Sequence, residues 1–137
     1  MALQVLRTPQ ARRVVEREMD GTARAGYEAA RDELRGRGCL AGGHRMAATD
    51  GDDYPLCGRH LANDWRMYTT YPDEKTVVIV AIDRHTKSHD PAVVLAEVLR
   101  GLSTVGRRSR DKPPCCEDPA APPPLTDEVR EWLRAIV

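Results

Sequence analysis

Basic and imidazole side chains gather around one stretch of the sequence, residues 59–89. The set consists of Arg59, His60, Arg66, Arg84, His85, Lys87 and His89. Arginine holds phosphate groups and stabilises the negative charge that develops on them, and histidine exchanges protons near neutral pH. These residue types would therefore suit chemistry on a phosphodiester. The plainer alternative is the solvated edge of a β-hairpin, on which Arg66 pairs with Asp64 or Asp83.

Two strands of a β-hairpin are predicted to position this set. Residues 65–71 are rich in aromatic and β-branched side chains, which suit a pleated surface. Residues 77–82 form an unbroken apolar run, which is typical of a central strand covered on both faces. Pro72 and Asp73 favour a turn over residues 71–75. In such a hairpin residue 66 lies near residue 80, so we expect several of the cations at one end of the sheet.

Helix-capping residues and apolar periodicity define the other elements. Thr8-Pro9 predicts a helix start, and Thr22 is the expected N-cap of a second helix that ends at Gly36 and Gly38. We expect strands at 2–7, 44–48 and 54–63, and helices at 9–19, 22–37, 91–102 and 126–137. This order predicts an α+β fold, with a small antiparallel sheet and an N-terminal helical hairpin packed on one side of it.

The C-terminal part of the chain differs in composition from the rest. We predict a domain over residues 1–105, a proline-rich linker over 106–125 and an amphipathic helix over 126–137. The apolar stripe of that helix is formed by Val129, Trp132, Leu133, Ile136 and Val137. A helix of this length is not stable alone. The stripe should therefore dock on the chain's own domain or on a second copy of the chain.

Composition sets limits on partners and location. The 21 basic and 21 acidic residues give no net charge, so no overall field draws the chain to nucleic acid or to a membrane. No segment approaches the roughly 20 apolar residues that a membrane helix needs. The N-terminus lacks the apolar core of a signal peptide. We therefore expect a cytoplasmic protein with reduced thiols.

Cysteine and histidine residues also invite a metal-site interpretation. Cys39 and His44 have the spacing C-x4-H, and Cys57 and His60 have the spacing C-x2-H, but neither matches a familiar zinc motif. The glycine-rich phosphate loop with its lysine, the GxSxG motif and the HExxH motif are all absent from the sequence. We expect no metal and no cofactor, and we expect the thiols to be inert.

The order of elements and two short motifs resemble the RelE/ParE toxin superfamily of bacterial type II toxin–antitoxin systems. The segment DWRMYTTY is similar to that family's Gly-Asp-Tyr-Arg-Val-x-Tyr strand. The segment VVIVAIDRHT is similar to its valine-rich strand that ends in an Arg or His-Arg motif. The resemblance covers roughly residues 2–102 and leaves the C-terminal tail unmatched.

The RelE branch implies a metal-independent mRNA endoribonuclease in the ribosomal A site, neutralised by a cognate antitoxin. Its nucleophile is the 2′-hydroxyl of the RNA, and its product carries a cyclic phosphate. By this resemblance Arg66 binds the scissile phosphate and Arg84 stabilises the transition state, whereas His85 or His89 acts as acid or base. By the same resemblance Arg59 and His60 stand where the family often has basic residues. We expect these two residues and Lys87 to bind RNA.

Two departures from the family pattern keep an alternative open. The usual C-terminal catalytic tyrosine has no counterpart among residues 86–90, and the net charge is zero where ribosome-binding toxins are usually basic. Either His89 takes the place of the tyrosine or the protein is not a ribonuclease. The alternative is a non-enzymatic protein: a ParE-like inhibitor of DNA gyrase, or a degenerate toxin that acts as a protein-binding module.

Overall fold

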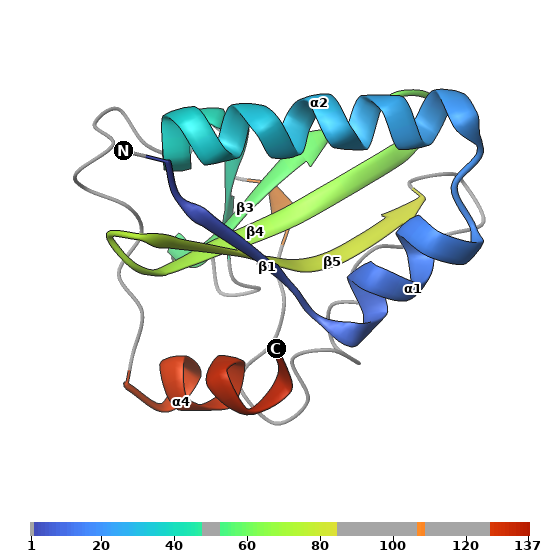
Figure 1. The fold of residues 1–137 in the computed structure, drawn as a ribbon. Coiled ribbons are helices and arrows are strands. Elements are labelled where there is room, and N and C mark those ends of the chain that lie inside the picture. The colour runs from blue at the N-terminus through green and yellow to red at the C-terminus, as the bar shows by residue number, and fades with distance from the viewer. Residues whose placement is uncertain (1, 48–52, 85–106, 109–126) are drawn as a thin grey trace.

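The computed structural model describes residues 2–47, 53–84, 107–108 and 127–137, which form an α+β fold (Figure 1). Its elements in chain order are β1 (Gln4–Arg7), α1 (Pro9–Arg17), α2 (Gly21–Arg37), the 3-10 helix η1 (Gly38–Ala41), β2 (His44–Ala47), β3 (Asp53–His60), β4 (Trp65–Asp73), β5 (Thr76–Arg84), β6 (Arg107–Arg108) and α4 (Asp127–Ile136). The helix predicted at 91–102 and most of the predicted linker lie outside the described residues.

The strands form one mixed sheet in the order β1-β5-β4-β3-β2-β6. Strands β2 to β5 form an antiparallel meander, whereas β1 is parallel to β5. The prediction of an antiparallel sheet is therefore wrong for β1. A parallel pair needs a long crossover connection, and here α1, α2 and the first three meander strands separate β1 from its partner.

The N-terminus of each long helix is capped by a polar side chain. Oγ1 of Thr8 accepts a hydrogen bond from the amide of Ala11, as predicted, and also donates to the carbonyl of Val80 at 2.7 Å. The cap of α2 is Asp20 and not the predicted Thr22, because Oδ1 of Asp20 accepts from the amide of Ala23 at 2.8 Å. An aspartate is as good an N-cap as a threonine, so the helix starts earlier than predicted.

Helices α1 and α2 pack on one face of the sheet and build the main core. This core contains Ala11, Val14, Val15, Met19, Ala23, Tyr27, Ala30 and Leu34 from the helices, and Cys57, Trp65, Met67, Tyr71, Val77, Ile79 and Ile82 from the strands. All six residues of the apolar run 77–82 are buried, as predicted for a central strand. Burial of this apolar surface is the main stabilising term of the fold.

The other face of the sheet carries a second buried layer. Leu56, Tyr68, Val78 and Val80 are at most 2% exposed but do not belong to the helix-side core. Helix α4 lies on this side of the sheet, away from α2 (Figure 1). Its Leu133 is 1% exposed, and Nε of Arg130 donates to the carbonyl of Pro72 at 2.9 Å. The C-terminal helix thus docks on its own domain.

The register of the central hairpin differs from the predicted one. Tyr68 opposes Ala81 and Thr69 opposes Ile79, so Val80 is the extra residue of a β-bulge. The strands also extend further, since Asp73 pairs with Thr76 across a two-residue turn. As a result Arg66 opposes Asp83 rather than residue 80.

Candidate functional site

Three polar side chains form a row across strands β3, β4 and β5, near the end of β3, on the face away from α1 and α2. His60 of β3 opposes Arg66 of β4, and Arg66 opposes Asp83 of β5. Side chains alternate along a strand, and Trp65 and Met67 on either side of Arg66 point into the helix-side core. The row therefore faces the other way.

His60 and Arg66 are in direct contact. The guanidinium Nη2 of Arg66 lies 3.1 Å from Nε2 of His60. A guanidinium has donors but no acceptor, so Nε2 must accept this bond and the proton of the neutral imidazole lies on Nδ1. The contact thus holds a proton-accepting nitrogen beside a permanent positive charge, with His60 exposed and Arg66 half-buried.

Asp83 completes the row on its other side. Its side chain is buried, at 7% exposure, although it lies at the end of β5 next to the exposed Arg84. Directly opposite residues of an antiparallel pair have Cβ atoms roughly 5 Å apart, so Asp83 and Arg66 are direct neighbours across the β4–β5 ladder. The plainer alternative from the sequence pairs Arg66 with Asp64 or Asp83, and of these two residues Asp83 lies opposite Arg66 in the register.

Arg84 lies on the opposite face of the sheet from Arg66. It opposes Trp65 in the register, and its guanidinium carbon is 5.0 Å from the centre of a Trp65 ring. Trp65 is 4% exposed and belongs to the helix-side core. Arg84 therefore makes a cation–π contact over that core, and the structure does not bring it together with Arg66 on one face.

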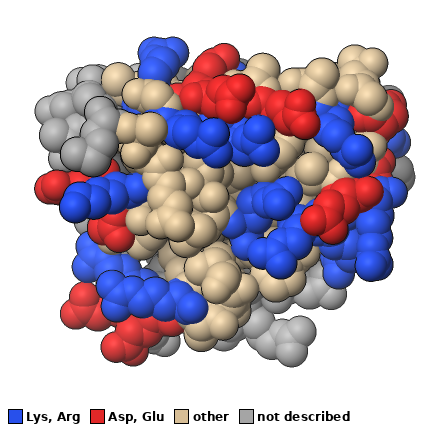
Figure 2. Space-filling view, in the orientation of Figure 1, with Lys and Arg blue, Asp and Glu red and all other residues tan. Residues whose placement is uncertain are grey.

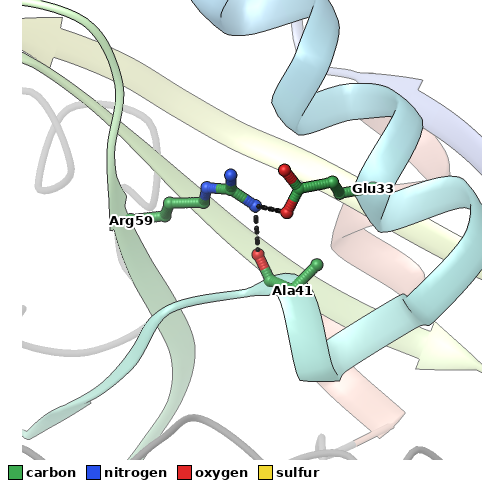
Figure 3. A network of polar contacts seen from close by, with 3 residues as sticks. All are labelled: Glu33, Ala41 and Arg59. Atoms are coloured by element: carbon green, nitrogen blue, oxygen red, sulfur yellow. Dashed lines mark hydrogen bonds and ion pairs between the residues drawn. The ribbon is translucent and has the colours of Figure 1, made fainter.

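Arg59 also lies on the helix side, where it is held by two acceptors (Figure 3). Its Nη1 donates to Oε2 of Glu33 at 2.9 Å and to the carbonyl of Ala41 at 3.0 Å. The hydrogen bond and the charge of Arg59 lower the pKa of the Glu33 carboxyl, and burial opposes this shift. The predicted RNA-binding Arg59 thus links β3 to α2 and η1.

The predicted site residues His85, Lys87 and His89 lie outside the described residues. Glu33 was not anticipated from the sequence. It occupies an exposed position on α2 and meets a residue 26 positions later in the chain. A lone acidic residue on the polar side of a helix carries no signal of such a contact.

The cysteine and histidine residues do not assemble a metal site in the part of the chain that the structure describes. No three His, Cys, Asp or Glu side chains are grouped there in a way that could hold a metal ion. Cys39 is a buried cysteine outside any disulfide, whereas Cys57 is disulfide-bonded. The expectation of reduced thiols is therefore wrong for Cys57.

The charged surface is mixed in sign. Figure 2 shows lysine and arginine side chains interspersed with acidic ones around an uncharged central area. Ion pairs among the described residues include those of Asp32 with Arg31 and Arg35, each at 3.9 Å, and that of Arg59 with Glu33 at 2.9 Å. This mixture agrees with the absence of net charge.

Comparison with known proteins identifies no relative. No protein-family model, no curated protein and no solved structure matches the chain. Among the described residues, no helix has the length and apolar character needed to cross a membrane. Function therefore has to be inferred from the geometry of the site and from the motifs in the sequence.

Proposed function

We propose that the chain is a RelE-like toxin, an mRNA endoribonuclease that acts on the ribosome and is neutralised by a cognate antitoxin. The observation that carries this proposal is the contact between Nη2 of Arg66 and Nε2 of His60 at 3.1 Å. It joins a phosphate-binding group to a proton acceptor at the strand position where the family motif has its arginine. The element order of strand, two helices and an antiparallel meander agrees with the resemblance.

In this proposal Arg66 binds the scissile phosphate and stabilises the charge that develops on its oxygens. In the complex with RNA, a phosphate oxygen competes with Nε2 of His60 for the hydrogen bond that Nη2 of Arg66 donates. Nε2 of His60 is then available to take the proton of the 2′-hydroxyl as this oxygen attacks phosphorus. The bond to the 5′-oxygen of the next nucleotide breaks, which leaves a 2′,3′-cyclic phosphate. His85 or His89 is the proposed acid that protonates the leaving oxygen.

The proposal changes two roles that the resemblance implies. His60 becomes the general base rather than an RNA contact, because its ring meets Arg66 directly. Arg84 becomes a structural residue, because it stacks over Trp65 on the other face. In this proposal Arg66 and Lys87 make the remaining contacts with the RNA.

A protein-binding function without catalysis, such as gyrase inhibition, is the second candidate. It is favoured by the lack of net charge and by the engagement of Arg59 and Arg84 in contacts within the molecule. Nucleic-acid affinity comes largely from cations that reach phosphates, so each arginine engaged elsewhere weakens the ribonuclease case.

Inducible expression of four chains in a bacterial host distinguishes the two candidates: wild type, Arg66→Ala, Arg84→Ala and the double variant. The ribonuclease proposal predicts growth arrest with cleaved mRNA for wild type and for Arg84→Ala, and neither effect for Arg66→Ala. Arrest by a folded double variant at wild-type strength would contradict it. Arrest with intact mRNA and altered DNA supercoiling would favour the gyrase candidate.

A further inference from the structure

The end of β3 is fixed to the helical layer immediately before the candidate base. Arg59 and His60 are consecutive residues, so their side chains leave the strand on opposite faces. Arg59 is bonded to Glu33 and to the carbonyl of Ala41, whereas His60 contacts Arg66. Any movement of the Arg59 backbone therefore moves His60 relative to Arg66.

Two further contacts hold the same strand end. Gly43 adopts a φ of 92°, and its Cα packs so closely on β3 that an added Cβ would meet the carbonyl of Gly58 and lie 3.0 Å from Cα of Arg59. On the other side the amide of Leu61 donates to the carbonyl of Trp65 at 2.8 Å. The backbone around His60 is thus fixed by the η1–β2 connection and by the β3–β4 turn, and the side chain of Glu33 joins it to α2.

We infer that Glu33 is a positioning residue for His60, which acts by holding Arg59 and thereby keeps Nε2 of His60 directed at Arg66. Its effect on activity rests on the proposed ribonuclease function, but its effect on the ring of His60 does not. Glu33 itself lies on the helix side of the sheet and touches neither His60 nor the proposed RNA phosphate. Misplacement of a catalytic group by about 1 Å can lower a rate by about 100-fold.

The test measures the protonation pattern of the His60 ring in the full-length protein. Long-range proton–nitrogen NMR spectra of 15N-labelled protein at about pH 8, where histidines are neutral, report which ring nitrogen carries the proton. The variant His60→Gln assigns the signal. We expect wild type to show the Nδ1-protonated tautomer, and Glu33→Ala to show signals averaged over both tautomers.

Asp32→Ala is the matched control. It removes a neighbouring carboxylate from the same helix, one that makes only 3.9 Å ion pairs with Arg31 and Arg35, and it should leave the His60 signal unchanged. Glu33→Gln provides a second variant that keeps the side-chain length but not the charge. An unchanged His60 tautomer in both folded Glu33 variants would overturn the inference.

Kinetics with an RNA substrate separate this inference from the proposed function. We expect Glu33→Ala to lower kcat by about tenfold or more with KM unchanged, because Arg66 still binds the phosphate. If wild type cleaves no RNA while the His60 ring still responds to Glu33, the proposed function fails and the positioning role stands. If wild type cleaves RNA and Glu33→Ala does so equally well, the positioning role fails.

Discussion

The side-chain amide of Gln10 pairs with the backbone of Ile82 in the way a neighbouring strand would. Nε2 of Gln10 donates to the carbonyl of Ile82 at 2.9 Å, and the amide of Ile82 donates to Oε1 of Gln10 at 3.1 Å. Strand β1 stops pairing with β5 at Ile79. Gln10 therefore satisfies the backbone of β5 where β1 no longer reaches it, and it ties the start of α1 to the end of the sheet.

Replacement of Gln10 by alanine should lower the free energy of unfolding by about 1–3 kcal/mol. The substitution leaves the part-buried amide and carbonyl of Ile82 without these hydrogen-bond partners. Leaving a buried polar group unsatisfied costs about 1–3 kcal/mol of stability. Urea denaturation measures the change. Gln4→Ala is the control, since Gln4 is exposed on β1. Equal losses for the two variants would mean that the pairing with Ile82 contributes nothing.

The ion pair between Glu33 and Arg59 should make stability depend on pH in the acidic range. Arg59 lowers the pKa of Glu33 from its ordinary value of 4.5. A carboxyl with a depressed folded-state pKa stabilises the fold above its unfolded-state pKa, and this contribution is lost as the pH falls through the folded value. Glu33→Gln should thus be less stable than wild type at neutral pH, by no more than about 1 kcal/mol because the pair is partly exposed.

The same comparison at lower pH decides whether this charge effect is real. The stability difference between wild type and Glu33→Gln should shrink towards zero as the pH falls below the ordinary carboxyl value of 4.5 and through the lowered pKa of Glu33. Asp32→Asn serves as the control at each pH. A difference that stays constant from neutral to acidic pH would show that Glu33 acts through packing and not through its charge.

Arg84 is expected to matter for stability more than for activity. Its cation–π contact with Trp65 is exposed on one side, and such contacts contribute about 0.5–1 kcal/mol. Arg84→Ala should therefore lose about this much stability and alter the fluorescence of Trp65, and Arg84→Lys should retain part of both. If a fully folded Arg84→Lys variant no longer cleaves RNA, Arg84 has a catalytic role as the family resemblance implies.

Leu133 should account for most of the attachment of α4. It is 1% exposed, whereas Val137 in the same C-terminal segment is 40% exposed. Leu133→Ala should cost about 2–5 kcal/mol if the whole domain unfolds with the helix, and Val137→Ala should change stability by less than about 0.5 kcal/mol. Limited proteolysis supplies a second measurement, since a detached α4 is cut before the domain. Similar behaviour of the two variants would contradict the docking seen at Leu133.

Most elements of the described fold could be predicted because they depend on local chemistry. Thr8 and Pro9 define the start of α1, and the apolar run 77–82 forms a central buried strand. The direction of β1 could not be predicted, because strand orientation depends on which strand becomes its neighbour. The bulge at Val80 was also missed, since a bulge leaves no mark in a continuous run of apolar residues.

The residue types of the candidate site could be predicted from the sequence, but most of their spatial arrangement could not. The sequence places Arg66 and Arg84 at the open end of one hairpin, but a register change by an odd number of residues decides whether the two side chains share a face of the sheet. That change separates Arg84 from Arg66 and brings Asp83 opposite Arg66. The contact of Arg66 with His60 depends on the register between β3 and β4. No spacing of residues in the sequence specifies that register.

The pairing of His60 with Arg66 is tested most directly by cleavage of mRNA on purified ribosomes. Wild type should yield fragments that end in a 2′,3′-cyclic phosphate. His60→Gln and Arg66→Ala should each reduce kcat/KM by at least about 100-fold, while Arg84→Ala stays close to wild type. Cleavage by folded His60→Gln and Arg66→Ala at the wild-type rate, or no cleavage by wild type, would contradict the account.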